Sequence, residues 1–364
     1  MPRVSREGRR RMSEPEGDPG TATPAGALRP KTRSVAHRRA GEDVLPVEGR
    51  LGSFDRARGW LNSKPLSSDA LRGRVVLVDF WTYTCVNWLR TLPYLKAWNA
   101  KYAASGLTVV GVHTPEFRFE RDLSNVIARS QDLGVDYPIA IDDHYGVWED
   151  FANHYWPAVY LADAHGRVRF HHFGEGEYAM TEMAIQQLLV EAGAEIDLDL
   201  VDVEPRGLEV AADWASLGSP ETYLGYDRAD GFVGGMSAPY DRPHSFPPAG
   251  RLGRNTWSLE GEWSVTREAV EVAAPGSRLS FAFRARDVNL VAAPAPGRAV
   301  PIRVTLDGAP IGIDHGADID ADGRGTIVDA NTLQLVRQTG AVVDRVVQIE
   351  FLEAGAAAYC LTFG

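Results

Sequence analysis

The chain has 364 residues, of which 44% are hydrophobic, a normal balance for a globular protein with enough material for two domains of ordinary size. No apolar run reaches the roughly 20 residues that span a bilayer, so no membrane span is expected. The formal net charge of -11 argues against a nucleic-acid surface, which would need a clustered basic patch.

Residues 1–45 are predicted to form a disordered tail, because they are rich in Arg, Pro, Gly, Ser and Thr and contain few large apolar residues. The triplet Arg9, Arg10 and Arg11 is similar to the start of an export signal, but the apolar stretch of about 7 to 15 residues that such a signal needs does not follow. We therefore expect a cytoplasmic protein. Its two cysteines also fit a reducing compartment better than a disulfide scaffold.

A cysteine follows a predicted buried strand. Residues 75–81 are almost continuously apolar and include β-branched side chains, which is typical of a strand buried on both faces. Apolar residues at spacings near three and four after Cys85 predict an amphipathic helix that ends near Gly106. Cys85 is therefore expected on the first turn of this helix, where unpaired amides and the helix dipole lower the thiol pKa to about 3.5 to 7.5.

The usual partner of such a cysteine is missing. Three residues after Cys85 stands Trp88, and the only other cysteine is Cys360. A Cys-x-x-Cys pair cycles between dithiol and disulfide by itself, whereas a lone thiolate must be resolved by another molecule or by a distant cysteine. The sequence therefore predicts monothiol chemistry.

The segment around Cys85 resembles thioredoxin. The shared features are Val-Asp-Phe-Trp at residues 78–81, the cysteine four residues later and Pro93 eight residues after that cysteine. The resemblance implies that Pro93 kinks the active-site helix. It also implies that Pro157, which introduces a further apolar strand, is the cis-proline opposite the thiol.

The middle of this domain is longer than in thioredoxin. With the phrases at residues 111–116 and 173–178, it is similar to the TlpA/redoxin branch, and in particular to the thioredoxin-like part of DipZ-type proteins. The resemblance implies an α/β thioredoxin-like fold over residues 46–193. The resemblance also implies an extracytoplasmic location as the alternative to the cytoplasm. The predicted elements after the first helix are strands at 107–113, 137–141, 156–161 and 167–173 and helices at 118–133 and 181–192.

Several residues are predicted to shape the site around the catalytic Cys85. By resemblance, Asp79 is the buried aspartate that moves the proton of a second cysteine; with Trp88 in that place, Asp79 either has a structural role or tunes Cys85. The aromatic residues are expected to form a wall around the thiol, and His113 and Glu116 close the neighbouring strand. The full set comprises Asp79, Trp81, Thr82, Tyr83, Trp88, Trp156, Pro157, His113 and Glu116.

Thr82 also matches half of a peroxiredoxin signature, since it stands three residues before Cys85, but the proline position of that signature is Val78. A peroxidase further needs an arginine beside the thiolate. Arg167 and Arg169, on a later strand, are the candidates. The histidines show no metal spacing with either cysteine, so no metal is expected.

Residues 194–254 are predicted to be a connecting segment, and residues 255–364 an all-β sandwich, because short alternating segments recur there between turn residues. The corresponding region of DipZ-type proteins resembles a carbohydrate-binding module, which implies a carbohydrate ligand. The aromatic residues of residues 255–364 are nevertheless expected to fill the core of the sandwich. They are Trp257, Trp263, Phe281 and Phe283. The predicted strands lie at 257–265, 279–285, 288–292, 302–306, 326–328, 346–351 and 358–363.

Residues 318–323 match the first half of a calcium loop, and Asp329 stands at its twelfth position. An EF-hand needs a helix on each side, whereas the flanks here are predicted strands. An Asp-Gly hairpin turn is therefore the favoured interpretation.

Three functional hypotheses follow. In the favoured one, Cys85 attacks a disulfide or a peroxide, an external thiol resolves the product, and no cofactor takes part. The alternative is a catalytically silent thioredoxin-fold binding module joined to a ligand-binding β-sandwich. In the third, Cys360 is the resolving residue, although a free cysteine is usually a small buried hydrophobe.

Overall fold

The computed structural model describes residues 45–234 and 239–364, and all of them belong to one compact unit. The predicted amino-terminal tail lies outside the described residues, apart from its last position. In the described part of the chain, no helix combines the length and apolar character needed to cross a membrane.

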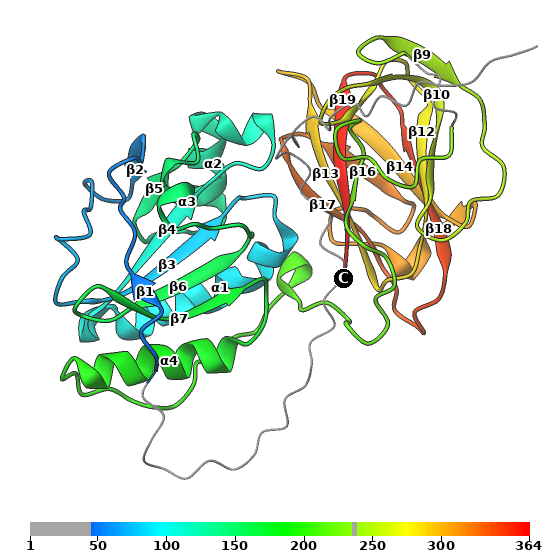
Figure 1. The fold of residues 1–364 in the computed structure, drawn as a ribbon. Coiled ribbons are helices and arrows are strands. Elements are labelled where there is room, and N and C mark those ends of the chain that lie inside the picture. Colours follow the sequence, from blue (N-terminus) through cyan, green and yellow to red (C-terminus); the bar gives the residue numbers. More distant parts are fainter. Residues whose placement is uncertain (1–44, 235–238) are drawn as a thin grey trace, which may run out of the picture. The chain divides into compact units, whose positions relative to one another are not determined.

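The first half of the chain forms a seven-stranded sheet (Figure 1). Its order is β1-β7-β6-β3-β4-β5-β2, and the pairs β3–β4 and β4–β5 are parallel. The strands are β1 (Gly49–Arg50), β2 (Gly59–Leu61), β3 (Val75–Trp81), β4 (Leu107–His113), β5 (Ile139–Ile141), β6 (Ala158–Ala162) and β7 (Arg167–Phe173). This is the predicted thioredoxin-like arrangement, with β3 at the centre of the sheet.

Both faces of β3 are buried, as its apolar run predicts. Val75 and Leu77 pack on one side with residues of α1 and α4, whereas Val76 and Val78 pack on the other with α3. Alternate side chains of a strand point to opposite faces, so a central strand needs apolar residues at every position. The helical elements are α1 (Val86–Tyr102), η1 (Ala103–Ser105), η2 (Arg118–Arg121), α2 (Leu123–Asp132), α3 (Gly146–Asp150) and α4 (Tyr178–Glu191).

The predicted helix at 118–133 is interrupted at Asp122. This residue has an extended backbone, and its carboxylate accepts a hydrogen bond from the Ser124 amide at 2.9 Å, so it caps α2 instead of continuing η2. The short helix α3 and the edge strands β1 and β2 were not predicted.

The second half forms a twelve-stranded sheet that curls on itself into the predicted β-sandwich (Figure 1). Pairing between its named strands is antiparallel. Its strands are β8 (Thr222–Tyr223), β9 (Pro243–Phe246), β10 (Trp257–Val265), β11 (Val270–Val272), β12 (Ser277–Phe283), β13 (Asp287–Pro294), β14 (Val300–Leu306), β15 (Ala309–Pro310), β16 (Arg324–Ile327), β17 (Asn331–Arg337), β18 (Arg345–Phe351) and β19 (Ala356–Phe363). The strands β8 and β9 come from the predicted connecting segment, which also holds η3 (Gly207–Glu209).

The two layers of the sandwich meet at β10. Its first half pairs with β12 and its second half with β9 and β11. Gly261 lies at this change of partner with φ +90, a conformation that L side chains rarely adopt. The four aromatic residues that were expected to fill the core of the sandwich are at most 1% exposed, so the expectation of core packing is confirmed.

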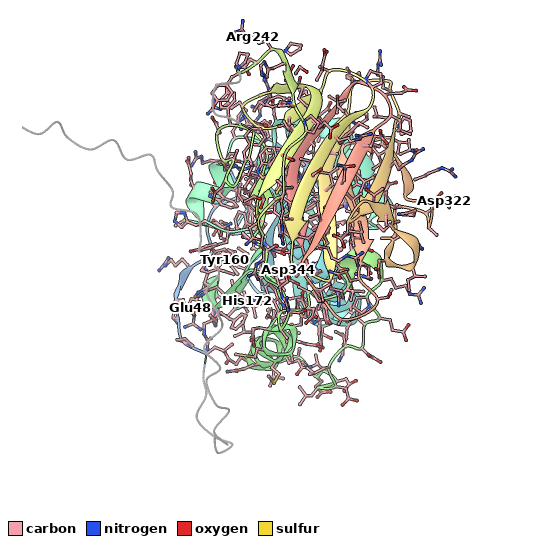
Figure 2. The ribbon with its side chains drawn as sticks, turned by 90° about the vertical axis from the view of Figure 1, so that its right-hand side faces the viewer. Glu48, Tyr160, His172, Arg242, Asp322 and Asp344 are labelled. Carbon is pink, nitrogen blue, oxygen red and sulfur yellow. The ribbon has the colours of Figure 1, made fainter. Side chains whose placement is uncertain are left out.

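The calcium-like segment is a turn before β16, and the elements beside it are η4 (Gly312–Asp314) and that strand, so the flanking helices of an EF-hand are absent. The Asp320 carboxylate accepts from the Arg324 amide at 2.8 Å. Asp322 lies at the surface (Figure 2), and its carboxylate pairs with the Arg324 side chain at 3.0 Å. Within residues 45–234 and 239–364, no group of three or more His, Cys, Asp or Glu side chains is arranged to hold a metal ion.

Gly261→Ala should lower the free energy of unfolding by about 2 kcal/mol or more, because an added Cβ would lie 3.0 Å from the Ser277 Cα and the backbone would be strained. Gly276→Ala is the matched control: its φ is +78, but nothing lies within 4 Å of an added Cβ. It should cost only the backbone strain, about 1 kcal/mol. Urea unfolding measures both, and equal losses would contradict the role of the close contact.

Candidate functional site

The loop from β3 to α1 places Cys85 as the N-cap residue of the helix. Its amide donates to the Thr82 carbonyl at 3.2 Å, and its carbonyl accepts from the Leu89 amide at 3.0 Å. Residues 81–84 and Val86 are buried, whereas Cys85 is partly exposed. Cys85 is therefore the residue of this loop that a reagent can reach.

The thiol pKa is raised well above its usual value, which reverses the predicted lowering. Loss of hydration is the largest cause, followed by the negative charges of Glu116 and Glu221. The backbone amides of Trp88 and Asn87 do lower the pKa, as a position on the first turn predicts, but they are outweighed. Cys85 as a residue nevertheless remains partly exposed.

Trp88 occupies the place of a second cysteine and faces Asp79. Its Nε1 donates to the Asp79 Oδ2 at 2.8 Å, and its ring stacks on Trp81 with centroids 4.1 Å apart. Burial raises the pKa of Asp79 to about 7, and its other oxygen has no hydrogen-bond partner. Of the two roles predicted for Asp79, these contacts support the structural one.

The predicted aromatic wall is divided. The Trp81 ring stacks on Trp88 and makes an edge-to-face contact with His113, with ring centroids 4.9 Å apart. Tyr83 stacks on the same His113 ring, with centroids 5.8 Å apart. Trp156 instead packs on Trp148, at 4.3 Å. Burial lowers the pKa of His113 to about 3, so this ring is neutral at pH 7.

The peptide bond between Trp156 and Pro157 is cis, as the resemblance implies. Ala158 pairs with Phe80, so Pro157 lies opposite Trp81, at the end of β3 where the cysteine loop begins. Arg167 and Arg169 lie near the other end, since Val168 pairs with Ala162 and Ala162 with Val76. The Arg169 side chain pairs with Asp163 and Glu191, so the expectation of an arginine from β7 beside the thiol is wrong.

Glu120 joins the cysteine loop to the loop after β4. One carboxylate oxygen accepts from the Thr84 hydroxyl at 2.5 Å, and the other accepts from the amides of Glu116 and Phe117 at 2.7 and 2.8 Å. The group is fully buried, and burial raises its pKa to about 7. The sequence did not single out Glu120, because an isolated glutamate carries no motif.

The second half of the chain also contributes to the site. The Tyr223 hydroxyl lies 2.6 Å from a Glu116 carboxylate oxygen and 2.9 Å from one of Glu221. The Arg228 guanidinium pairs with Glu116 at 3.0 Å and covers the Tyr223 ring at 3.5 Å. These residues were not predicted, since they lie more than 100 positions after Glu116.

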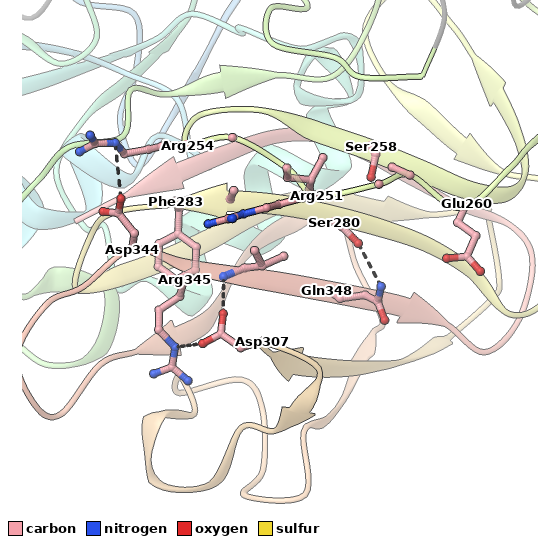
Figure 3. Close-up of a pocket in the computed structure, with 16 residues that line it drawn as sticks. Arg251, Arg254, Ser258, Glu260, Ser280, Phe283, Asp307, Asp344, Arg345 and Gln348 are labelled. Carbon is pink, nitrogen blue, oxygen red and sulfur yellow. Dashed lines mark hydrogen bonds and ion pairs between the residues drawn. The ribbon is translucent and has the colours of Figure 1, made fainter.

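The β-sandwich carries a cavity of about 730 Å³ on the face of β10, β12 and β18 (Figure 3). Polar pairs line it, among them Ser280 with Gln348 and Asp307 with Arg345. Its aromatic residue, Phe283, is fully buried. The cavity therefore lacks the exposed ring on which a sugar would stack.

Asp79→Asn tests the raised pKa of Asp79. In the wild type, the folded state holds the carboxyl proton more tightly than the unfolded state, so the free energy of unfolding falls as the pH rises from about 4 to about 7. The amide cannot ionise, so the variant should gain up to about 4 kcal/mol relative to the wild type across that window. Urea unfolding at both ends measures the gain, with the exposed Asp69→Asn as control; a pH-independent difference would contradict the raised pKa.

Comparison with known proteins agrees with this architecture. The redoxin family matches residues 55–187, and the thioredoxin-like C-terminal domain family matches residues 219–364. Protein DipZ of Mycobacterium tuberculosis is 38% identical over 264 residues, which cover 69% of this chain but only 36% of DipZ. The chain thus spans about a third of the length of that relative.

Two further likenesses cover the first domain. The thiol-disulfide oxidoreductase YkuV of Bacillus subtilis is 25% identical over 134 residues, or 37% of this chain and 90% of YkuV. The solution structure of a thioredoxin-like protein in the oxidized form is 26% identical, covers 39% of this chain and 97% of that chain, and superposes with a TM-score of 0.36. The chain thus contains a redoxin domain followed by a thioredoxin-like C-terminal domain, and it is similar to proteins of the TlpA/redoxin type.

Proposed function

We propose that the protein is a thiol-disulfide oxidoreductase whose nucleophile is Cys85. The observation that carries this proposal is the position of Cys85: it is the N-cap residue of α1 and the partly exposed residue of an otherwise buried loop. The name of YkuV, a thiol-disulfide oxidoreductase, supports the same chemistry.

In the proposed reaction, the Cys85 thiolate attacks one sulfur of a substrate disulfide. A mixed disulfide forms at Cys85, and the other half of the substrate leaves as a thiolate. A second thiol must then attack the mixed disulfide, and an external thiol reductant supplies the electrons that return the protein to its reduced state. The backbone amides of Asn87 and Trp88 stabilise the attacking thiolate.

The site supports a disulfide substrate better than a peroxide substrate. Peroxide reduction needs an arginine that holds the thiolate and the peroxide together, and the two candidates on β7 lie elsewhere. Thr82, the other half of the peroxiredoxin signature, is buried. We therefore place peroxide as the weaker alternative, which sulfenic acid at Cys85 after limiting hydrogen peroxide would support.

A catalytically silent binding module is the second candidate. The raised pKa of Cys85 favours it, because only the thiolate is a nucleophile. The cavity of the β-sandwich is then the place for a ligand. A carbohydrate ligand remains a hypothesis, and the cavity offers it no exposed aromatic ring for stacking. Calorimetric titration with oligosaccharides would test this hypothesis.

The cytoplasm remains our proposed location, since both cysteines are free and a reducing compartment keeps them so. Secretion into an oxidising compartment would expose Cys85 to stable disulfide formation. Fractionation of cells that produce the full chain would decide between the two locations.

The Cys360→Ser variant, in which Cys85 has no second protein thiol to resolve it, should form a mixed disulfide with oxidised glutathione at Cys85, detectable by mass spectrometry as one added glutathione. Cys85→Ser alone should form no adduct, because the remaining Cys360 is 1% exposed. A Cys360→Ser variant that stays unmodified under conditions that modify a small free thiol would contradict the proposed function and favour the binding module.

Glu116→Gln should lower the midpoint of Cys85 alkylation against pH, because it removes the first of the two negative charges that raise the thiol pKa. Below the midpoint the thiolate fraction falls about tenfold per pH unit, so the variant should react several-fold faster at pH 7. Glu149→Gln, which removes an exposed carboxylate paired with Arg56, is the control. A wild-type midpoint below the ordinary value of about 8.5 would contradict the raised pKa.

A further inference from the structure

Cys360 faces away from the apolar core of the β-sandwich. On β19 it pairs with Val291 of β13, and Val291 pairs in turn with Thr332 of β17. Directly opposed residues share one face of a sheet. The neighbouring row, which includes Leu290 and Leu361, belongs to the apolar core. The row that holds Cys360 therefore lies on the other face, where Cys360 packs against Phe117 of the redoxin domain.

The same row reaches the cysteine loop. The Thr332 hydroxyl donates to the carbonyl of Thr84, the residue before Cys85, at 2.7 Å. Strands are spaced about 4.8 Å apart, so Cys360 lies about 10 Å from Thr332 across β13. The carboxylates of Glu221 and Glu116 act on both thiols. Cys85 and Cys360 thus border one patch between the two domains.

Glu221 is placed to exchange a proton with the second thiol. Cys360 pairs with Tyr223 of β8, whose hydroxyl lies 2.9 Å from a Glu221 carboxylate oxygen, while the Cys360 thiol itself donates to the Leu361 carbonyl at 3.5 Å. The single phenol proton of Tyr223 can be donated to only one of Glu116 and Glu221 at a time, which leaves a carboxylate oxygen of the other free to accept a proton. Loss of hydration and repulsion from Glu116 raise the pKa of Glu221, although water still reaches this residue.

We propose that Cys360 is the second thiol of the redox centre and that Glu221 accepts its proton. In this proposal Cys360 replaces the missing second cysteine, and Glu221 takes over the proton transfer that the resemblance assigns to Asp79. Asp79 instead accepts a hydrogen bond from Trp88, which stands in the place of that cysteine. This inference rests on the proposed attack by Cys85. Because Cys360 is buried and Cys85 is accessible, the substrate meets Cys85 first.

The proposed second step is balanced within the chain. The Cys360 thiolate attacks the Cys85 sulfur of the mixed disulfide, the Cys85–Cys360 disulfide forms, and the second half of the substrate leaves as a thiolate. Two electrons pass from the two protein thiols to the substrate disulfide, and the Cys360 proton moves to Glu221. A disulfide requires Cα atoms about 4.4 to 6.8 Å apart, so the loop and β19 must reach that separation.

The test uses the full chain with one equivalent of dithionitrobenzoate, a symmetric disulfide whose released thiolate is coloured. The wild type should release two thiolates in succession, keep no label, and yield a peptide that links Cys85 to Cys360 in mass spectrometry. Cys360→Ser should release one thiolate and keep the label on Cys85. Cys85→Ser should release none without denaturant.

The decisive result comes from the wild type, so it does not depend on the folding of a variant. One release with a label retained on Cys85 overturns the role of Cys360 and leaves the proposed function standing. No release overturns both. Glu221→Gln should slow the second release about tenfold or more relative to the first. Glu271→Gln, on the strand beside β19, is the matched control, and equal slowing in both variants overturns the role of Glu221.

Discussion

The buried carboxylate of Glu120 is the constraint on which the site depends. It accepts hydrogen bonds from the loop that carries Cys85 and from the loop that carries Glu116 and Phe117. A buried carboxylate is stable only when such donors satisfy it, so the three bonds fix both loops together. The C-terminal sheet then packs on this joined surface, through Phe117 and through the bond from Thr332 to Thr84.

The electrostatics of the site follow from this assembly. A helix N-terminus favours a thiolate, and the amides after Cys85 do act in that direction. When the C-terminal sheet packs on the redoxin domain, the Cys85 thiol loses hydration and the negative charge of Glu221 joins that of Glu116. Together these effects raise the thiol pKa by more than the amides lower it. The same fold that presents the thiol therefore keeps it protonated, and reactivity becomes dependent on pH and on the charges of the second domain.

Local chemistry was readable from the sequence. The run of β3, the helix after Cys85 and the proline after Trp156 each carry a strong local signal, and the structure has β3, α1 and a cis bond there. The thiol pKa was not readable, because its causes come from other segments. The bond from Thr332 to Thr84 joins positions 248 residues apart, and no spacing rule anticipates it. The polar residues of β13 and β17 have the pattern of a solvated face, which hid their contact with the redoxin domain.

The buried polar face of β13, β17 and β19 bears on how the two domains are held together. Asn289, Thr332 and Thr362 are at most 4% exposed, yet all three are polar. An apolar interface resists separation because water must be ordered around each newly exposed group, whereas polar groups exchange their partners for water at little net cost. Between the two domains, the hydrogen bond from Thr332 to Thr84 fixes the geometry of the contact, while the apolar packing of Phe117 with Val291 and Cys360 resists separation.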